Sequence, residues 1–385
     1  MNGTGFSLTA SGLFDRLLGG KRFVRADSSR LERRAVVAAL VAWVPLAAMA
    51  LLLRDGAEGA AIGFFQDIVT HVRFLVVLPL LIYAERIIGQ RTKIVADTFL
   101  TSGLIGDEDV SRFQSAVSKV KRLLDSIFVE LILLVFAYSI FWFGFRARTG
   151  ETNNWFDAGL GGERLTAAGW WYVVVTPLVG FLFLRWLWRY GVWAWFLHRL
   201  ARLDLRLVGT HPDRAGGLGF VKIGHAAFTV IFFAASCAVA AGIANEIFHL
   251  GASLRSFQTA LIAYGVLGMG VALAPLLLFS RPLIKAKRKW RIEYSRMATR
   301  YVQTFERKWL GADTGDDEEL KISSDLQGLA DLGGGMDRLT EMSRYFLDLK
   351  TAAAFAMALA FPLVPLVLTV VPAREILMLL VKVVA

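Results

Sequence analysis

The sequence predicts an all-α protein: a multi-pass transmembrane helical bundle of about seven spans. Of its 385 residues, 56% are hydrophobic and only 19% are charged, and the mean hydropathy is +0.52. Soluble domains contain about 45–50% apolar residues. A helix of about 20 residues crosses the hydrocarbon core of a bilayer, which is about 30 Å thick. Seven apolar stretches approach or reach that length: 36–53, 68–84, 127–145, 170–190, 220–243, 260–280 and 352–371.

Lysine and arginine are concentrated in alternate hydrophilic pieces of the chain. Of the 43 basic residues, 33 lie in four pieces, whereas the four pieces that alternate with them hold seven. Basic loops are retained in the cytoplasm, so this pattern predicts a cytoplasmic N-terminus and an outer C-terminus in the inner (plasma) membrane. The basic pieces are 1–34, 85–125, 198–222 and 281–350.

The same pattern explains the net charge of +11 without a nucleic-acid partner. Ten basic residues and two glutamates fall in 281–308, which we expect to continue from the sixth span as a basic helix. Each basic residue near an anionic membrane surface gains about 1 kcal/mol. The expected partners are therefore the lipid bilayer and its anionic headgroups. A homo-oligomer and a cytoplasmic protein partner remain open.

The spans and the charge divide the chain into four regions. Residues 1–34 form a basic cytoplasmic tail, and 35–280 form a six-span membrane region with a helical cytoplasmic loop at 85–125. Residues 281–350 form a helical cytoplasmic segment that is basic and then acidic. Residues 351–385 hold the seventh span and an outer interfacial helix at 374–385, because about 18 Å of helix is too short to cross the bilayer.

Between the spans, the apolar spacing predicts several shorter elements. Residues 6–18 suit a short interfacial helix. Apolar residues at helical spacing over 110–123 predict a helix that runs into the third span. The acidic 311–320 is expected to be a surface loop. Two amphipathic helices are predicted on either side of three glycines at 333–335, and the second, 336–350, is expected to feed into the seventh span.

Within the spans, tryptophan and small residues have distinct expected roles. Six of the 11 tryptophans lie between Trp170 and Trp195, where an aromatic belt at the two membrane interfaces is expected. Small residues let helices approach closely, so the fifth and sixth spans are expected to form the tight centre of the bundle or an oligomer contact. These small residues are Ala234, Ala238, Gly242, Gly265, Gly268 and Gly270.

Ionisable residues inside spans form two predicted layers. Each costs about 2.5–3.5 kcal/mol on insertion unless it has a partner, water or an escape to the surface. The short carboxylate of Glu130 needs a partner, for which Arg185 is the best candidate. One interpretation is a pathway with a vestibule at each end and an apolar gate between them; the alternative is snorkelling cations and structural pairs. The inner layer comprises Glu85, Glu130, Arg185, Arg189 and His225, and the outer layer comprises Asp67 and His71 beside Arg73.

The most distinctive motif is His-Pro-Asp-Arg-Ala-Gly-Gly-Leu-Gly at 211–219, before the fifth span. Asp213 can cap the segment after it, and exposed amides beside Arg214 could hold an anion. The alternative is a structural re-entry turn that locks the fourth and fifth spans together. The ligand or anion candidates are His211, Asp213, Arg214, Gly216, Gly217 and Gly219. This loop and the span layout resemble a group of uncharacterised bacterial multi-pass inner-membrane proteins, and the resemblance implies no activity.

These observations leave three functional hypotheses. The first is a channel- or transporter-like protein for ions or small solutes with a cytoplasmic gate. The second is a membrane-embedded scaffold or signalling partner that uses its cytoplasmic helical loops. The third is a membrane enzyme that uses His211 and Asp213, although no catalytic residue, metal site or cofactor is predicted. The single cysteine, Cys237, excludes an intramolecular disulfide.

Overall fold

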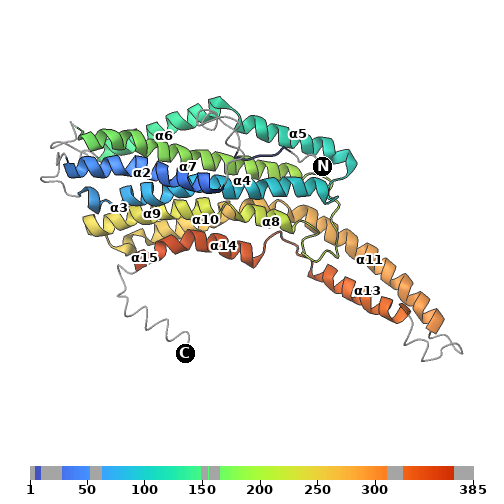
Figure 1. Cartoon of the computed structure of the whole chain (residues 1–385). Helices are drawn as coiled ribbons and strands as arrows, with labels where there is room; N and C mark the ends of the chain where they lie inside the picture. Colours follow the sequence, from blue (N-terminus) through green and yellow to red (C-terminus); the bar gives the residue numbers. More distant parts are fainter. Residues whose placement is uncertain are drawn as a thin grey trace.

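The computed structural model of the chain describes residues 5–9, 28–52, 63–148, 155, 165–309 and 324–367. This part of the chain is helical, apart from turns, irregular connections and isolated β-bridges such as the one between Ile105 and Leu205. Seven of its helices are long and apolar enough to cross a membrane. The predicted all-α bundle of seven spans is therefore confirmed (Figure 1).

Several spans are built from more than one helical segment. The second and fourth are 34 residues long, about 51 Å at 1.5 Å per residue, so both extend well beyond a bilayer core of about 30 Å. In chain order the spans are α2 (Ser28–Leu52); α3 (Ile68–Val72), η3 (Arg73–Val77) and α4 (Leu78–Thr101); α6 (Ile127–Arg148); α7 (Ala167–Leu200); α8 (Gly219–Ala226) and α9 (Thr229–Leu250); α10 (Gln258–Leu277); and α14 (Leu349–Ala360), η5 (Phe361–Leu363) and α15 (Val364–Val367). Two short 3-10 turns, η2 (Phe64–Gln66) and η4 (Leu254–Phe257), precede the second and sixth spans.

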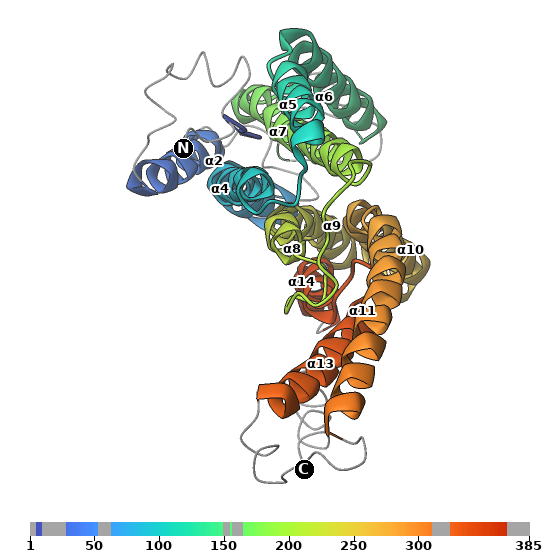
Figure 2. The same ribbon diagram turned by 90° about the vertical axis from the view of Figure 1, so that its right-hand side faces the viewer.

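The spans form two groups that meet at α4. Seen along the bundle, α2, α6 and α7 lie on one side of α4, and α8, α9, α10 and α14 lie on the other (Figure 2). Large aromatic side chains fill the core between them, including the fully buried Phe99, Trp193 and Phe228. The long α4 therefore brings the second span into contact with both groups.

Helix α5 (Asp107–Leu124) lies at the end of the bundle where α4 and α7 end. We call this the basic end, because the basic pieces 85–125, 198–222 and 281–350 meet there. Helix α5 begins after Gly106, and three acidic residues occupy its first turn. Their negative charge is stabilised by the positive end of the helix dipole. Its apolar face packs on α7. The prediction that this helix continues into the third span is wrong: α5 ends at Leu124, and α6 restarts at Ile127 after a turn.

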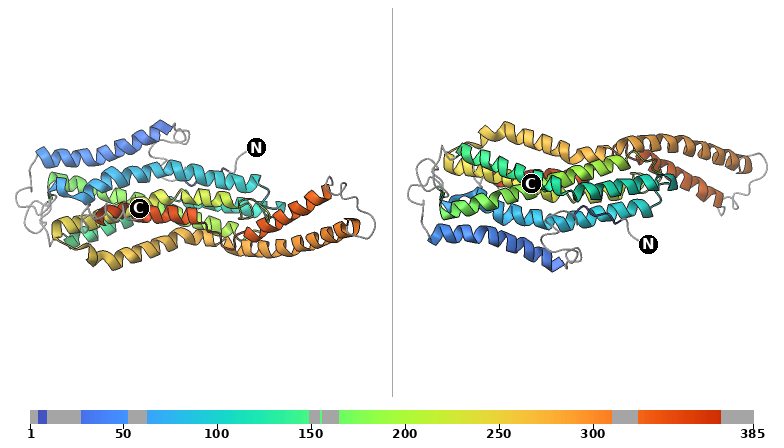
Figure 3. Two further views of the ribbon diagram at one scale, coloured as in Figure 1. Left: turned by 90° about the horizontal axis from the view of Figure 1, so that it is seen from below. Right: turned by 90° about the horizontal axis from the view of Figure 1, so that it is seen from above.

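A long helical hairpin projects beyond the basic end (Figures 1 and 3). It consists of α11 (Ser280–Trp309) and α13 (Ser324–Glu341). The glycines at 333–335 do not break α13, contrary to prediction. A Cβ at Gly335 would overlap the hydroxyl of Tyr294, and a Cβ at Gly328 would overlap that of Tyr301, so these two glycines let α13 approach α11.

The predicted helix at 336–350 is present only in part, at the end of α13 and the start of α14, and the prediction that it is one continuous helix is wrong. Helix α13 ends at Glu341, and the chain is not helical again until Leu349. The connecting segment buries Met342 and Phe346 in the core. The hairpin is therefore joined to the seventh span by a packed non-helical segment.

The N-terminal segment differs from the expected interfacial helix in its described part. Residues 5–9 are not helical, and Phe6 and Leu8 are 2% and 0% exposed. The Phe6 ring lies on Trp193 and Phe196 of α7, so these residues pack into the bundle and not on a membrane surface. The rest of 6–18, and all of 311–320 and 374–385, lie outside the described residues.

Two expectations about the spans also need correction. Trp186 and Trp193 are 2% and 0% exposed, so these two are interior hydrogen-bond donors and not members of an interfacial belt. Gly268 faces Leu359 of α14, but a Cβ at Gly265 or Gly270 would meet nothing within 4 Å. Helix α10 therefore packs on α14 and α7, and its other glycines face outwards.

Candidate functional site

Four of the five residues predicted for the inner layer form one ion-pair network across three helices. Arg185 Nε on α7 donates to Glu130 Oε1 on α6 at 3.1 Å. Arg185 Nη1 and Arg189 Nη1 both donate to Glu85 Oε1 on α4, at 3.3 and 3.0 Å. The two arginines are four residues apart and share one face of α7. The expected Glu130–Arg185 pair is thus present, and Glu85 joins the two arginines.

Three of the four members of the network are buried, and the fourth, Glu85, is 25% exposed. Glu130, Arg185 and Arg189 are 8%, 4% and 2% exposed. Arg189 also donates to the carbonyl of Thr9 at 3.2 Å and lies 5.0 Å from the centroid of the Trp186 ring. Removing one partner of a buried pair leaves an uncompensated charge, which costs several kcal/mol. The arrangement therefore ties α4, α6, α7 and the N-terminal segment together.

His225, the fifth residue predicted for this layer, has different partners. Trp193 Nε1 donates to its Nδ1 at 3.2 Å, and its Nε2 lies 2.7 Å from the carbonyl oxygen of Ala272. Because Nδ1 accepts a hydrogen bond, Nε2 carries the hydrogen and donates to that carbonyl. His225 is fully buried. It therefore links α8 to α7 and α10 as a neutral side chain.

The outer residues likewise have local partners. The Asp67 carboxylate accepts from the Thr70 amide and hydroxyl and from Trp155 Nε1. His71 Nδ1 accepts from Trp43 Nε1 at 2.9 Å. Arg73 Nη1 lies 2.7 Å from the hydroxyl of Tyr172. Asp67 caps α3, and it and His71 are held by different partners.

The Asp213 carboxylate organises the loop at 211–219. Oδ1 accepts from the amides of Ala215 and Gly217 at 2.8 and 3.1 Å, and Oδ2 accepts from the amide of Gly219 at 2.8 Å. Burial raises the pKa of Asp213, but the hydrogen bonds from these amides and from His211 together lower it by more, so the pKa lies below its usual value. The amides that would have to bind an anion therefore already donate to Asp213. This supports the alternative that the loop is a structural turn.

The backbone of this loop is also specialised. Arg214, Gly216 and Gly217 have φ values of 54°, 67° and 96°, a region that favours glycine. A Cβ at Gly219 would lie 3.1 Å from Asp213 Oδ2. The loop turns sharply so that Ala215 and Leu218 are fully buried.

The hairpin docks on the connection between α7 and α8 (201–218), which includes most of this loop, through residues that the sequence pattern did not single out. Trp290 Nε1 donates to the Leu207 carbonyl at 2.6 Å. Lys287 Nζ donates to the carbonyls of Thr340 and Met342 at 2.7 and 2.5 Å, at the C-terminus of α13, where a cation is favourable. An isolated tryptophan within a basic helix was the available signal for Trp290.

Backbone and charge contacts of Arg214 also hold the hairpin against the loop at 211–219. The Arg214 carbonyl accepts from the Ser343 amide at 2.9 Å, and Arg214 Nη2 lies 3.0 Å from Glu341 Oε2. The pKa of Lys287 is lowered by partial burial and by nearby Arg344 and Arg291. The loop at 211–219 is therefore a support for the hairpin as well as a link between the fourth and fifth spans.

The third hypothesis, an enzyme site, gains no support from side-chain clustering. Among the described residues, no group of three or more His, Cys, Asp or Glu side chains is arranged to hold a metal ion. His225 is buried and hydrogen-bonded to Trp193, whereas His211 is half-exposed and pairs with Asp213. No family model, curated protein or solved structure matches the chain.

Proposed function

We propose that this integral membrane protein is a docking protein that holds a basic helical hairpin in the cytoplasm for an acidic protein partner. The observation that carries this proposal is a stripe of cations on the face of α11 opposite α13. Lys285, Lys289, Arg296, Arg300 and Arg307 are all exposed, and their alternate spacing of four and seven residues places them on one helix face.

The opposite face of α11 is committed to the hairpin itself. Tyr294 donates to the Leu332 carbonyl at 3.0 Å, and Tyr301 donates to the Asp325 carbonyl at 2.9 Å. Lys308 pairs with Asp325 at 2.6 Å. These contacts fix the rotation of α11, so the cationic stripe points away from α13.

The distance along α11 separates its stripe into two parts. Lys285 and Lys289 lie near the start of the helix and can reach lipid headgroups. The second part comprises Arg296, Arg300 and Arg307. Its first residue, Arg296, lies 16 residues after Ser280, which is about 24 Å from the start of α11. The charge of these arginines complements an acidic protein surface, and such complementarity steers association. The contacts of Trp290 with Leu207 and of Arg214 with Glu341 hold the hairpin in a fixed direction.

The cytoplasmic location rests on the distribution of charge. The hairpin, α5 and the loop at 211–219 lie at the basic end of the bundle, and basic segments remain on the cytoplasmic side. The proposed orientation has the N-terminus on that side. Accessibility of cysteines introduced singly at Ser118 and Arg255, in a Cys237→Ala background, tests it in sealed vesicles.

Photo-crosslinking in intact cells tests the docking proposal. A photoreactive residue at the exposed Gln303 should form an adduct with a protein whose acidic segment is identified by mass spectrometry. The triple variant Arg296→Glu/Arg300→Glu/Arg307→Glu should abolish the adduct. The matched control, Lys119→Glu/Lys121→Glu/Arg122→Glu on exposed positions of α5, should keep it.

The purified partner must then bind the full chain in nanodiscs. Affinity should fall with added salt, and the triple variant on α11 should weaken it at least tenfold. An adduct with lipid alone, or equal loss of binding in the α5 control, would contradict a specific docking stripe.

The channel or transporter hypothesis is a second candidate, favoured by the charged residues at membrane depth on α4, α6 and α7. The mutual pairing of Glu85, Glu130, Arg185 and Arg189 also suits a structural role, which ranks transport second. Ion flux through liposomes should change in Glu130→Gln if the hypothesis is correct. Sealed liposomes without flux at several pH values would contradict it.

A further inference from the structure

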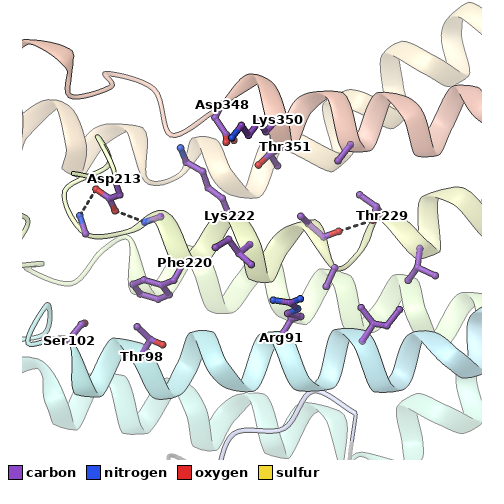
Figure 4. A pocket seen from close by; sticks show the side chains of 18 of the residues that line it. Arg91, Thr98, Ser102, Asp213, Phe220, Lys222, Thr229, Asp348, Lys350 and Thr351 are labelled. Atoms are coloured by element: carbon purple, nitrogen blue, oxygen red, sulfur yellow. Dashed lines mark hydrogen bonds between the residues drawn. The ribbon is translucent and has the colours of Figure 1, made fainter. Parts of the chain in front are cut away.

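A groove of about 960 Å³ lies between α4, α8 and α14 at the basic end of the bundle. It belongs neither to the ion-pair network nor to the cationic stripe of the hairpin. Figure 4 shows side chains from all three helices, and from the loop at 211–219, lining the same space. Its walls combine cationic, hydroxyl and apolar groups.

Three cations from three different helices line the groove: Arg91 on α4, Lys222 on α8 and Lys350 on α14. In the part of the chain that the structure describes, none of them is within ion-pairing distance of a carboxylate. Lys222 Nζ lies 5.0 Å from the centroid of the Phe346 ring, and it extends from α8 toward the start of α14 (Figure 4). These side chains are available to a phosphate group.

Two carboxylates, Asp213 and Asp348, also line the groove, and they differ in their hydrogen-bond partners. Asp213 is satisfied by three backbone amides. Asp348 has a buried Oδ1 without a hydrogen-bond partner in the described structure. Because Oδ1 is shielded from solvent, an occupant of the groove reaches the other carboxylate oxygen, Oδ2, and Asp348 accepts a donor there. With three cations and one such carboxylate, the groove favours an anion that also carries hydroxyl groups.

The remaining wall is apolar and runs from the basic end toward the membrane. Ile87, Ala226, Val230 and Ala354 lie deeper along their helices than the loop at 211–219. Ile223, also on the groove, is 60% exposed. A free phosphate would leave this surface uncovered, whereas an acyl chain would cover it.

We propose that the groove is a binding site for one anionic phospholipid with a hydroxyl-bearing headgroup. The phosphate contacts Lys222 and Lys350, Arg91 adds positive charge from the α4 wall, a headgroup hydroxyl donates to Asp348, and an acyl chain lies along Ala226, Val230 and Ala354. Because the groove is lined by α4, α8 and α14, the lipid joins α4 to the second group of spans at the membrane surface.

Native mass spectrometry of the delipidated full chain tests this site, with phosphatidylglycerol and phosphatidylcholine of identical acyl chains as probes. One phosphatidylglycerol should bind at least tenfold more tightly than phosphatidylcholine. Arg91→Gln/Lys222→Gln/Lys350→Gln should lower phosphatidylglycerol affinity at least tenfold. The control Lys93→Gln/Lys119→Gln/Lys121→Gln removes the same charge from exposed positions outside the groove and should bind normally.

A second variant keeps all the charges. Ala354 is exposed on the groove wall, and Ala354→Trp should block the acyl chain and lower phosphatidylglycerol affinity at least fivefold. If the triple variant does not fold, this variant decides the question. Equal affinity for the two lipids, unchanged binding in Ala354→Trp, or displacement of the lipid by an equal concentration of inorganic phosphate would overturn the proposal.

Discussion

Arg185 on α7 and Glu130 on α6 are joined by a hydrogen-bonded ion pair, with Nε 3.1 Å from Oε1. Both side chains are at least nine-tenths buried, and Arg185 also reaches Glu85 on α4. One guanidinium therefore holds two carboxylates from helices that are far apart in the sequence. This relationship ties α6 and α7 to α4.

Loss of Glu130 should destabilise the bundle. Glu130→Ala removes one partner of a buried pair, and we expect a cost of roughly 3 kcal/mol, the lower end of the usual range, because Glu85 still pairs with Arg185. Titration with SDS in mixed micelles measures the free energy of unfolding. Arg86→Ala, which breaks the exposed pair with Glu32 at 3.1 Å, should cost less than about 1 kcal/mol. Similar losses for both variants would contradict a special role for the buried network.

Asp213 should make stability depend on acid pH. Its pKa in the folded chain is below the ordinary value of 3.8, so its contribution is complete above that value and is lost as the pH falls through the folded-state pKa. The melting temperature of the wild type should therefore fall more steeply below about pH 4 than that of Asp213→Asn. Parallel pH profiles would show that the carboxylate does not stabilise the loop.

Glycine substitutions in α13 should have opposite effects according to their side of the helix. Gly335→Ala forces a Cβ against the Tyr294 hydroxyl and should cost about 1–3 kcal/mol of hairpin stability. A Cβ at Gly334 meets nothing within 4 Å, so Gly334→Ala should gain up to about 1 kcal/mol from helix propensity. Hydrogen exchange of α13 amides measures both, and faster exchange in Gly334→Ala would contradict the packing of the hairpin.

The Trp290 indole should fix the direction of the hairpin. Trp290→Phe keeps a ring but loses the donor to the Leu207 carbonyl, a loss of about 1 kcal/mol. Spin labels at Gln303 and Ser118, in a Cys237→Ala background, should then give a broader distance distribution between α11 and α5. Trp309→Phe, at the distal end of α11, should leave that distribution unchanged.

Sequence periodicity predicted helices well but predicted their ends poorly. It indicated a helix before the third span, yet the turn between Leu124 and Ile127 separates α5 from α6. It indicated a break at 333–335, yet α13 continues through these glycines, and Gly335 allows Tyr294 of α11 to approach. In the second case a contact with a distant segment, between Gly335 and Tyr294, accompanies the difference.

The sequence by itself determined the class of the protein, its seven spans and the concentration of charge on alternate loops, because hydrophobic length and charge are local properties. It also indicated that Glu130 needs a partner. The tertiary structure alone decided that Glu85 joins Arg185 to Arg189, that His225 pairs with Trp193, and that Arg91, Lys222 and Lys350 line one groove. These contacts connect residues up to about 260 positions apart, and such distances are set by packing and not by local sequence.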